Sequence, residues 1–290
     1  MGRLIAGATS ANVAAATAFI ADVSGKNDRS SRFGLVGATF GAGFVIGPAI
    51  GGFLGEYGLR LPFYAAAALA FANALYGIFV LPESLRPGDR RPINWARANP
   101  FGLLGRVWRD PKLRSMAFAW SCSWIGLGAV QSSLVLFTRY SFGWGAAANG
   151  WVLAGIGLSQ AVVEGVLLSS VTGRLGERRT ALLGYAAGAL GYAVLALALA
   201  GWTVVLLALG GLAVPSVRAM VSARGDADTQ GEMQGVLTAV EGLTAVVAPL
   251  LTAWLFYAFT SPALPVHFAG APFVLAAGAA VMAAVLLRRL

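Results

Sequence analysis

The sequence predicts an all-α, polytopic membrane protein with about nine transmembrane helices. The chain of 290 residues is 58% hydrophobic and only 11% charged, whereas about 25% of the residues of a soluble domain are charged. Its apolar segments reach the roughly 20 residues that an α-helix needs to cross a bilayer. No segment alternates polar and apolar residues as a membrane β-strand does.

Nine apolar segments are long enough to be read as spans, in the order 1–21, 33–55, 61–82, 114–137, 149–170, 180–200, 202–217, 233–258 and 267–287. The second contains Pro48 and many glycines. The seventh is short and follows the sixth directly. The single cysteine, Cys122, lies within the fourth and has no intramolecular disulfide partner.

The net charge of +9 suggests a nucleic-acid partner, but the positions of the basic residues argue against it. If the connections alternate sides, all but three of the 21 Lys and Arg residues (Arg3, Arg60 and Arg139) fall on one side. Such an imbalance marks the cytoplasmic side, where basic loops also meet anionic lipid. We therefore expect a multi-pass protein of the cell inner (plasma) membrane, with its N-terminus outside and its C-terminus in the cytoplasm.

The spans divide unequally around the basic connection 83–113. Three precede it, in residues 1–82, and six follow it, in residues 114–290. Secondary transporters are commonly built from two equivalent halves. We therefore expect a partial N-terminal half, a cytoplasmic central loop and a complete C-terminal half, as in a six-plus-six transporter that lacks its first three spans.

A glycine pattern, G(x)8G(x)3GP(x)2GG, runs through the second segment at Gly34, Gly43, Gly47-Pro48 and Gly51-Gly52. Gly43, Gly47 and Gly51 recur every four residues, which predicts a stripe without side chains where another helix can approach closely. Pro48 removes a backbone donor and permits a kink. A second small-residue stripe, at Gly157, Ala161 and Gly165, is a candidate partner. Leucine at Gly47 or Gly51 should block this contact.

The glycine pattern resembles the antiporter motif in span five of drug/proton exchangers of the major facilitator superfamily. Other segments resemble the tetracycline-resistance branch of that superfamily: Gly2-Arg3, Ala21-Asp22, Leu81-Pro82-Glu83-Ser84, Asn99-Pro100, Gly173 to Arg179, and Gln230 to Gly235. The resemblance covers essentially the whole chain, from the equivalent of span four onward. It implies a major-facilitator-type helical bundle and proton-coupled efflux of a small amphiphilic, tetracycline-like drug.

The sequence departs from that branch in three respects. The first-half elements, including an acid in span one, have no counterpart. The branch carries a carboxylate in span nine where our alignment places Gly188, and a glutamine in span eight where this chain has Glu164. The substrate and the coupling residues therefore cannot be transferred directly.

Ionisable residues within spans are costly and are functional candidates. Arg3, Glu164 and Glu241 qualify, and we expect them to serve proton coupling. For Glu164, a structural ion pair with Arg174 or Arg178 is an equal alternative. For Glu241, a polar position near the cytoplasmic mouth is the alternative. For Arg3, a place in the outer interface is the alternative.

The resemblance also implies a gating loop, whose residues are Asp22, Gly173, Glu177, Arg178 and Arg179. Asp22 equally suits a helix cap paired with Lys26 or Arg29. Polar and aromatic side chains, suited to a planar polycyclic ligand, indicate a substrate path along two spans. They are Trp120, Trp124, Gln131, Ser159 and Gln160. Trp120 and Trp124 could instead face lipid.

No Cys/His pair has metal-ligand spacing, and no phosphate-binding glycine loop or nucleophile elbow occurs. The sequence thus predicts no metal, no cofactor and no enzyme. The expected partners are a small-molecule substrate, protons and the lipid bilayer, with a monomer favoured. Two alternative functions remain open: a truncated, non-transporting remnant, and a metabolite or sugar exporter of the same fold.

Overall fold

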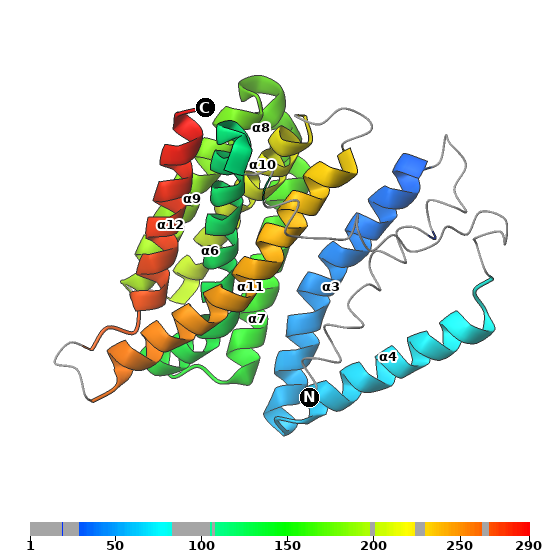
Figure 1. The fold of residues 1–290 in the computed structure, drawn as a ribbon. Helices are drawn as coiled ribbons and strands as arrows, with labels where there is room; N and C mark the ends of the chain where they lie inside the picture. The colour runs from blue at the N-terminus through cyan, green and yellow to red at the C-terminus, as the bar shows by residue number, and fades with distance from the viewer. Residues whose placement is uncertain are drawn as a thin grey trace.

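A computed structural model describes residues 19, 29–82, 105, 108–197, 201–223, 230–262 and 267–290. The regular structure of these residues is entirely helical (Figure 1). The elements are α3 (Arg29–Tyr57), α4 (Leu61–Phe79), α6 (Pro111–Phe142), α7 (Ala146–Val162), η2 (Val163–Leu167), α8 (Leu168–Leu175), α9 (Glu177–Ala196), η3 (Gly201–Leu212), α10 (Ala213–Ser222), α11 (Gln230–Thr260) and α12 (Ala271–Arg288).

The helices confirm the fold class that the hydropathy predicted. Every predicted span from 33–55 onward coincides with a helix, whereas span 1–21, apart from Phe19, lies outside the described residues. Within the described residues, five helical stretches are long and apolar enough to cross a membrane: Leu61–Phe79, Pro111–Phe142, Ala146–Ala196, Gly235–Thr260 and Ala271–Arg288. The third of these includes a sharp corner at Gly176, where φ is 77°.

Local sequence signals set the ends of α6. The Asp110 side chain accepts hydrogen bonds from the backbone N–H groups of Lys112 and Leu113, at 2.9 and 3.2 Å, and Pro111 occupies the first turn. The helix ends at Gly143, whose φ of 68° is left-handed and favours glycine. These signals fix a helix of 32 residues that runs through the middle of the bundle.

The short seventh segment reaches across the bundle because half of it is a 3₁₀-helix. η3 contains 12 residues and continues into α10, which contains 10. A 3₁₀-helix rises about 2.0 Å per residue and an α-helix about 1.5 Å. Together they extend about 39 Å, more than the roughly 30 Å hydrocarbon layer. The helix therefore ends at Ser222, beyond the predicted limit of residue 217, and includes Arg218, which we had placed in a connection.

Two hydrophobic cores lie at different heights along α6. One surrounds Trp120 and includes Tyr185, Val217 and Leu237. The other surrounds Phe137 and includes Phe273, whose ring centroid lies 5.0 Å from that of Phe137. The middle of α6, between Trp120 and Phe137, thus lies between two packed layers.

α3 packs along α7, as the predicted pairing of these two spans required. The contact is made by a different face of α3 from the one that we predicted. A Cβ atom on Gly52 would lie 2.7 Å from the Cα of Gly150, and one on Gly150 would lie 2.7 Å from the carbonyl oxygen of Pro48. Gly43, Gly47 and Gly51, in contrast, have no described atom within 4 Å of such a Cβ.

Two of the three residues of the predicted partner stripe, Ala161 and Gly165, do not make the contact, whereas the third, Gly157, is buried. Gly150, near the start of α7, meets α3, whereas Ala161 is exposed and a Cβ on Gly165 would meet no described atom. The closest glycine contacts lie where the end of α3 meets the start of α7. The small residues that recur every four positions on the two helices therefore do not meet there. The structural contribution of the glycine motif to this contact rests on Gly52 and the Pro48 carbonyl.

The neighbouring glycines Gly51 and Gly52 test this contact. Gly52→Ala places a methyl group against backbone atoms that cannot move aside cheaply, so we expect a loss of about 1–3 kcal/mol. Gly51→Ala meets no described atom within 4 Å and gains the same helix propensity, which makes it the matched control. Thermal unfolding in detergent should show a midpoint several degrees lower for Gly52→Ala than for Gly51→Ala. Equal midpoints would contradict the contact.

Candidate functional site

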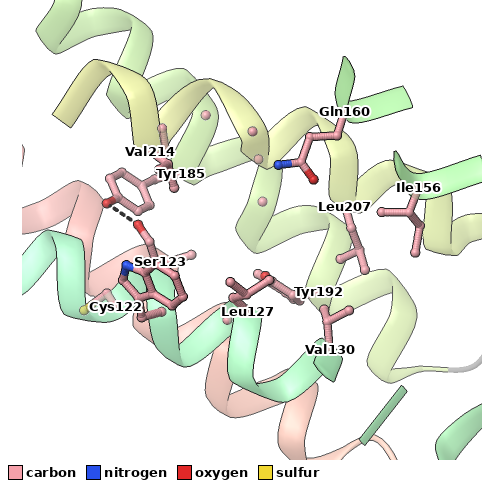
Figure 2. Close-up of a pocket in the computed structure, with 18 residues that line it drawn as sticks. Cys122, Ser123, Leu127, Val130, Ile156, Gln160, Tyr185, Tyr192, Leu207 and Val214 are labelled. Atoms are coloured by element: carbon pink, nitrogen blue, oxygen red, sulfur yellow. Dashed lines mark hydrogen bonds between the residues drawn. The ribbon is translucent and has the colours of Figure 1, made fainter. Parts of the chain in front are cut away.

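A pocket of about 280 Å³ opens between α6, α9 and the η3–α10 segment, with α7 at one side (Figure 2). On α6 its lining extends from Cys122 to Val130, and on α9 from Gly184 to Tyr192. These residues are the central turns of both helices, so the pocket lies between the two hydrophobic cores. Its height in the bundle corresponds to the middle of the spans.

Glycines form much of the pocket wall: Gly126, Gly184, Gly188, Gly210 and Gly211. They allow backbones to touch. A Cβ on Gly184 would lie 2.5 Å from the backbone nitrogen of Ala213, and one on Gly210 would lie 3.2 Å from the Cα of Gly188. α9 therefore lies directly against η3 at these glycines, and the side chains of Tyr185, Tyr192 and Leu207 line the pocket beside them.

Polar groups interrupt this apolar lining at a few points. The Tyr185 hydroxyl donates to the Ala119 carbonyl oxygen at 2.7 Å and lies 2.7 Å from the Ser123 hydroxyl (Figure 2). Trp124 also lines the pocket. Within the described part of the chain, its buried indole N–H has no hydrogen-bond partner.

Gln160 enters the pocket from α7, on the side opposite Ser123 and Tyr185 (Figure 2). Its Nε2 donates to Oε1 of Glu164 at 2.9 Å. A Cβ on Gly211 of the pocket wall would lie 3.4 Å from that same Oε1 atom. Glu164, whose side chain is exposed, therefore lies beside Gln160 and against η3, outside the pocket lining.

Glu164 lies in η2, a single π-helical turn closed by the hydrogen bond from the Leu168 N–H to the Val163 carbonyl. Such turns occur often at functional sites. Among the residues that the structure describes, no basic side chain forms an ion pair with Glu164. The proposed partner Arg178 is occupied elsewhere, because its Nε donates to the Leu287 carbonyl at 3.0 Å and its Nη2 to that of Arg288 at 2.5 Å.

The five predicted path residues separate into two groups. Trp124 and Gln160 line the pocket. Trp120 is fully enclosed in the core, so it faces neither a path nor lipid. Its ring lies 5.2 Å from the guanidinium carbon of Arg218. Gln131 is exposed and Ser159 is half-buried, and neither lines the pocket.

Of the three predicted coupling residues, Glu164 is the one beside the pocket. Glu241 is half-buried in α11, where the charge of Arg218 acts on it. This places Glu241 with Arg218 and Trp120, away from the pocket lining. Arg3, and also Asp22 of the predicted gating loop, lie outside the described residues.

The other predicted gating residues surround the corner between α8 and α9. Glu177 begins α9, and Arg178 binds the C-terminal carbonyls of α12 as described above. This arrangement joins α9 to α12 within the bundle. Gly173 and Arg179 are exposed, and a Cβ on Gly173 would meet no described atom within 4 Å.

Sequence reasoning missed Glu56 at the end of α3. Its Oε1 accepts a hydrogen bond of 2.8 Å from the backbone N–H of Ala147, in the first turn of α7. A carboxylate is favourable at this position because the N-terminus of a helix carries free N–H groups and partial positive charge. Glu56 lies four residues after Gly52, the last glycine of the motif, and this proximity is its only signal in the sequence.

The apolar helices and the pocket at mid-height define a multi-pass helical membrane protein of the transporter class. The comparison with protein families agrees. The model described as Major Facilitator Superfamily matches residues 1–213, and the chain belongs to that superfamily.

Several curated relatives are tetracycline resistance proteins. The class C protein of Escherichia coli is 38% identical over 268 residues, which cover 90% of this chain and 66% of that protein. The class G protein of Vibrio anguillarum is 38% identical over 259 residues, 86% of this chain and 64% of that protein. The human hippocampus abundant transcript 1 protein is 32% identical over 257 residues, 83% of this chain and 51% of that protein. The chain thus spans less than two thirds of the length of these relatives.

Proposed function

We propose that this chain is the larger part of a proton-coupled exporter of a small, amphiphilic, tetracycline-like drug. The observation that carries the proposal is the pocket at mid-height, with one carboxylic acid, Glu164, placed beside its polar residue Gln160. A lining that combines glycine backbone with aromatic rings and hydroxyl groups suits a planar polycyclic ligand. The names of the class C and class G relatives support the choice of tetracycline as the first ligand to test.

The position of Gly188 supports Glu164 as the proton carrier. Gly188 stands where the tetracycline-resistance branch carries a carboxylate, and a Cβ there would be in ordinary van der Waals contact, 3.4 Å from the Cα of Gly210. Glu164 approaches the same segment from the other side, at Gly211. One acid beside the pocket is therefore available to bind and release a proton, in a part of the protein where an ionisable group is otherwise costly.

The proposed organisation keeps residues 1–82 as part of an N-terminal half, 83–113 as a cytoplasmic connection and 114–290 as the C-terminal half. The contact of α3 with α7 then joins the two halves. The excess of basic residues in alternate connections supports an inner-membrane protein with a cytoplasmic C-terminus.

A fluorescent reporter fused after Leu290 should fold and emit in the cytoplasm. A fusion that does not fluoresce, together with activity of a second reporter that works only in the periplasm, would show the opposite orientation.

The substitution Glu164→Gln tests the proton-carrier role. Glutamine keeps the size and hydrogen-bonding capacity but cannot titrate. We expect proton-driven uptake of tetracycline into inverted vesicles to fall to background, while downhill exchange of tetracycline is retained. Both assays should be run at several pH values, with matched protein levels.

Normal proton-driven uptake by Glu164→Gln would remove Glu164 from the mechanism and make Glu241 the next candidate. Loss of both activities with a lower unfolding temperature would indicate a structural role. If the unmodified chain neither binds nor moves tetracycline, a non-transporting remnant is favoured. Movement of a sugar or another metabolite instead would favour the second alternative.

A further inference from the structure

We propose that Gln160 is the residue that couples ligand binding to the protonation of Glu164, by the orientation of its amide group. The inference rests on the proposed function of the pocket and of Glu164. It adds the residue that connects them and the hydrogen-bonding class of the ligand group at that point.

Gln160 contacts both the pocket and Glu164. Its side chain lines the pocket, and its Nε2 donates to Glu164 Oε1 at 2.9 Å. The two residues are four apart in the sequence, so their side chains lie on the same helix face. In the described part of the chain, Gln160 is the one pocket-lining side chain with a recorded hydrogen bond to Glu164.

An ionised Glu164 permits one amide orientation. A carboxylate only accepts hydrogen bonds, so the NH₂ group of Gln160 must face it. The carbonyl oxygen of Gln160 is then left to accept from the pocket. The bond to a charged acceptor is stronger than one between neutral groups, which holds this orientation. The pocket therefore presents an acceptor, and it favours a ligand with a hydroxyl or amide donor at this point.

A protonated Glu164 releases the amide. Its new O–H group can donate to the Gln160 carbonyl, which turns the NH₂ group toward the pocket. Both orientations are then allowed, and a ligand donor no longer meets a fixed acceptor. Ligand binding and proton binding thus oppose each other, and by linkage each displaces the other. This is the relation that exchange of a drug for a proton requires.

The surroundings of Glu164 leave the amide as its principal polar neighbour. Of the elements packed against η2, α7 and η3 contain no ionisable side chain. α8 contributes Arg174, which is ten residues and about 15 Å further along the helix. Around the pocket itself, the titratable groups are Cys122 on α6 and Tyr185 and Tyr192 on α9.

The test is the pH dependence of tetracycline binding to the full chain in lipid nanodiscs, measured at pH 8 and pH 4, a range wide enough to protonate a carboxylate side chain. Tetracycline itself changes its protonation state with pH. The ratio of the dissociation constants at the two pH values is therefore compared with the same ratio for Glu164→Gln, in which position 164 cannot titrate. The key variant is Gln160→Met, which keeps the length of the side chain but neither donates nor accepts through an amide. Leu158→Met, at an exposed position outside the pocket lining, is the control.

We expect the unmodified chain and Leu158→Met to lose about three- to tenfold more affinity between pH 8 and pH 4 than Glu164→Gln does, the worth of one hydrogen bond. Gln160→Met should behave like Glu164→Gln although Glu164 is intact. Tetraphenylphosphonium, which has no hydrogen-bonding group, should bind Gln160→Met and the unmodified chain with the same pH ratio.

Three results would overturn the inference. If Gln160→Met retains the pH ratio of the unmodified chain, the amide is not the coupling element, although the proposed function stands. If the unmodified chain has the same ratio as Glu164→Gln, or if tetracycline does not bind, the proposed function fails as well. Gln160→Leu and size-exclusion profiles of all variants guard against a folding defect in a single variant.

Discussion

The direct contact between the backbones of α9 and η3 is the constraint on which the site depends. Gly184 lies against the start of α10 and Gly188 against Gly210, so the two segments touch without side chains between them. This contact forms part of the pocket wall and places Gly211 beside the Glu164 carboxyl group.

The irregular helices contribute to this arrangement. The 3₁₀ geometry of η3 stretches a short apolar segment across the bundle, and its tighter winding brings both Gly210 and Gly211 to the pocket. The π turn of η2 closes through an i→i+5 hydrogen bond instead of an i→i+4 bond. Both Glu164 and its neighbour η3 thus depart from regular α-helical geometry at the point where they meet. The packed cores around Trp120 and Phe137 hold these segments on either side.

The sequence predicted the membrane class and the spans because a bilayer demands long apolar helices. It also selected Trp124, Gln160 and Glu164 as candidate site residues, because polar groups are unusual in such helices. Trp124 and Gln160 line the pocket. It could not predict which face of α3 meets α7, because two adjacent faces both carry residues of the motif. Gly47 and Gly51 lie on one face, and Pro48 and Gly52 lie on the other. Only the crossing of the helices selects the second. Trp120 was misassigned because an aromatic residue suits a core as well as a pocket, and Arg218 because the length of α10 depends on the 3₁₀ segment before it.

The central claim is that the pocket between α6, α9 and η3 holds the ligand. Cys122 lines it and is the single cysteine of the chain, so the protein carries its own reporter. The most direct measurement is the rate at which N-ethylmaleimide alkylates Cys122, followed by intact-protein mass spectrometry with and without saturating tetracycline. The account predicts a rate several-fold lower when tetracycline is bound. An unchanged rate under conditions in which binding is independently demonstrated would contradict it and place the ligand elsewhere.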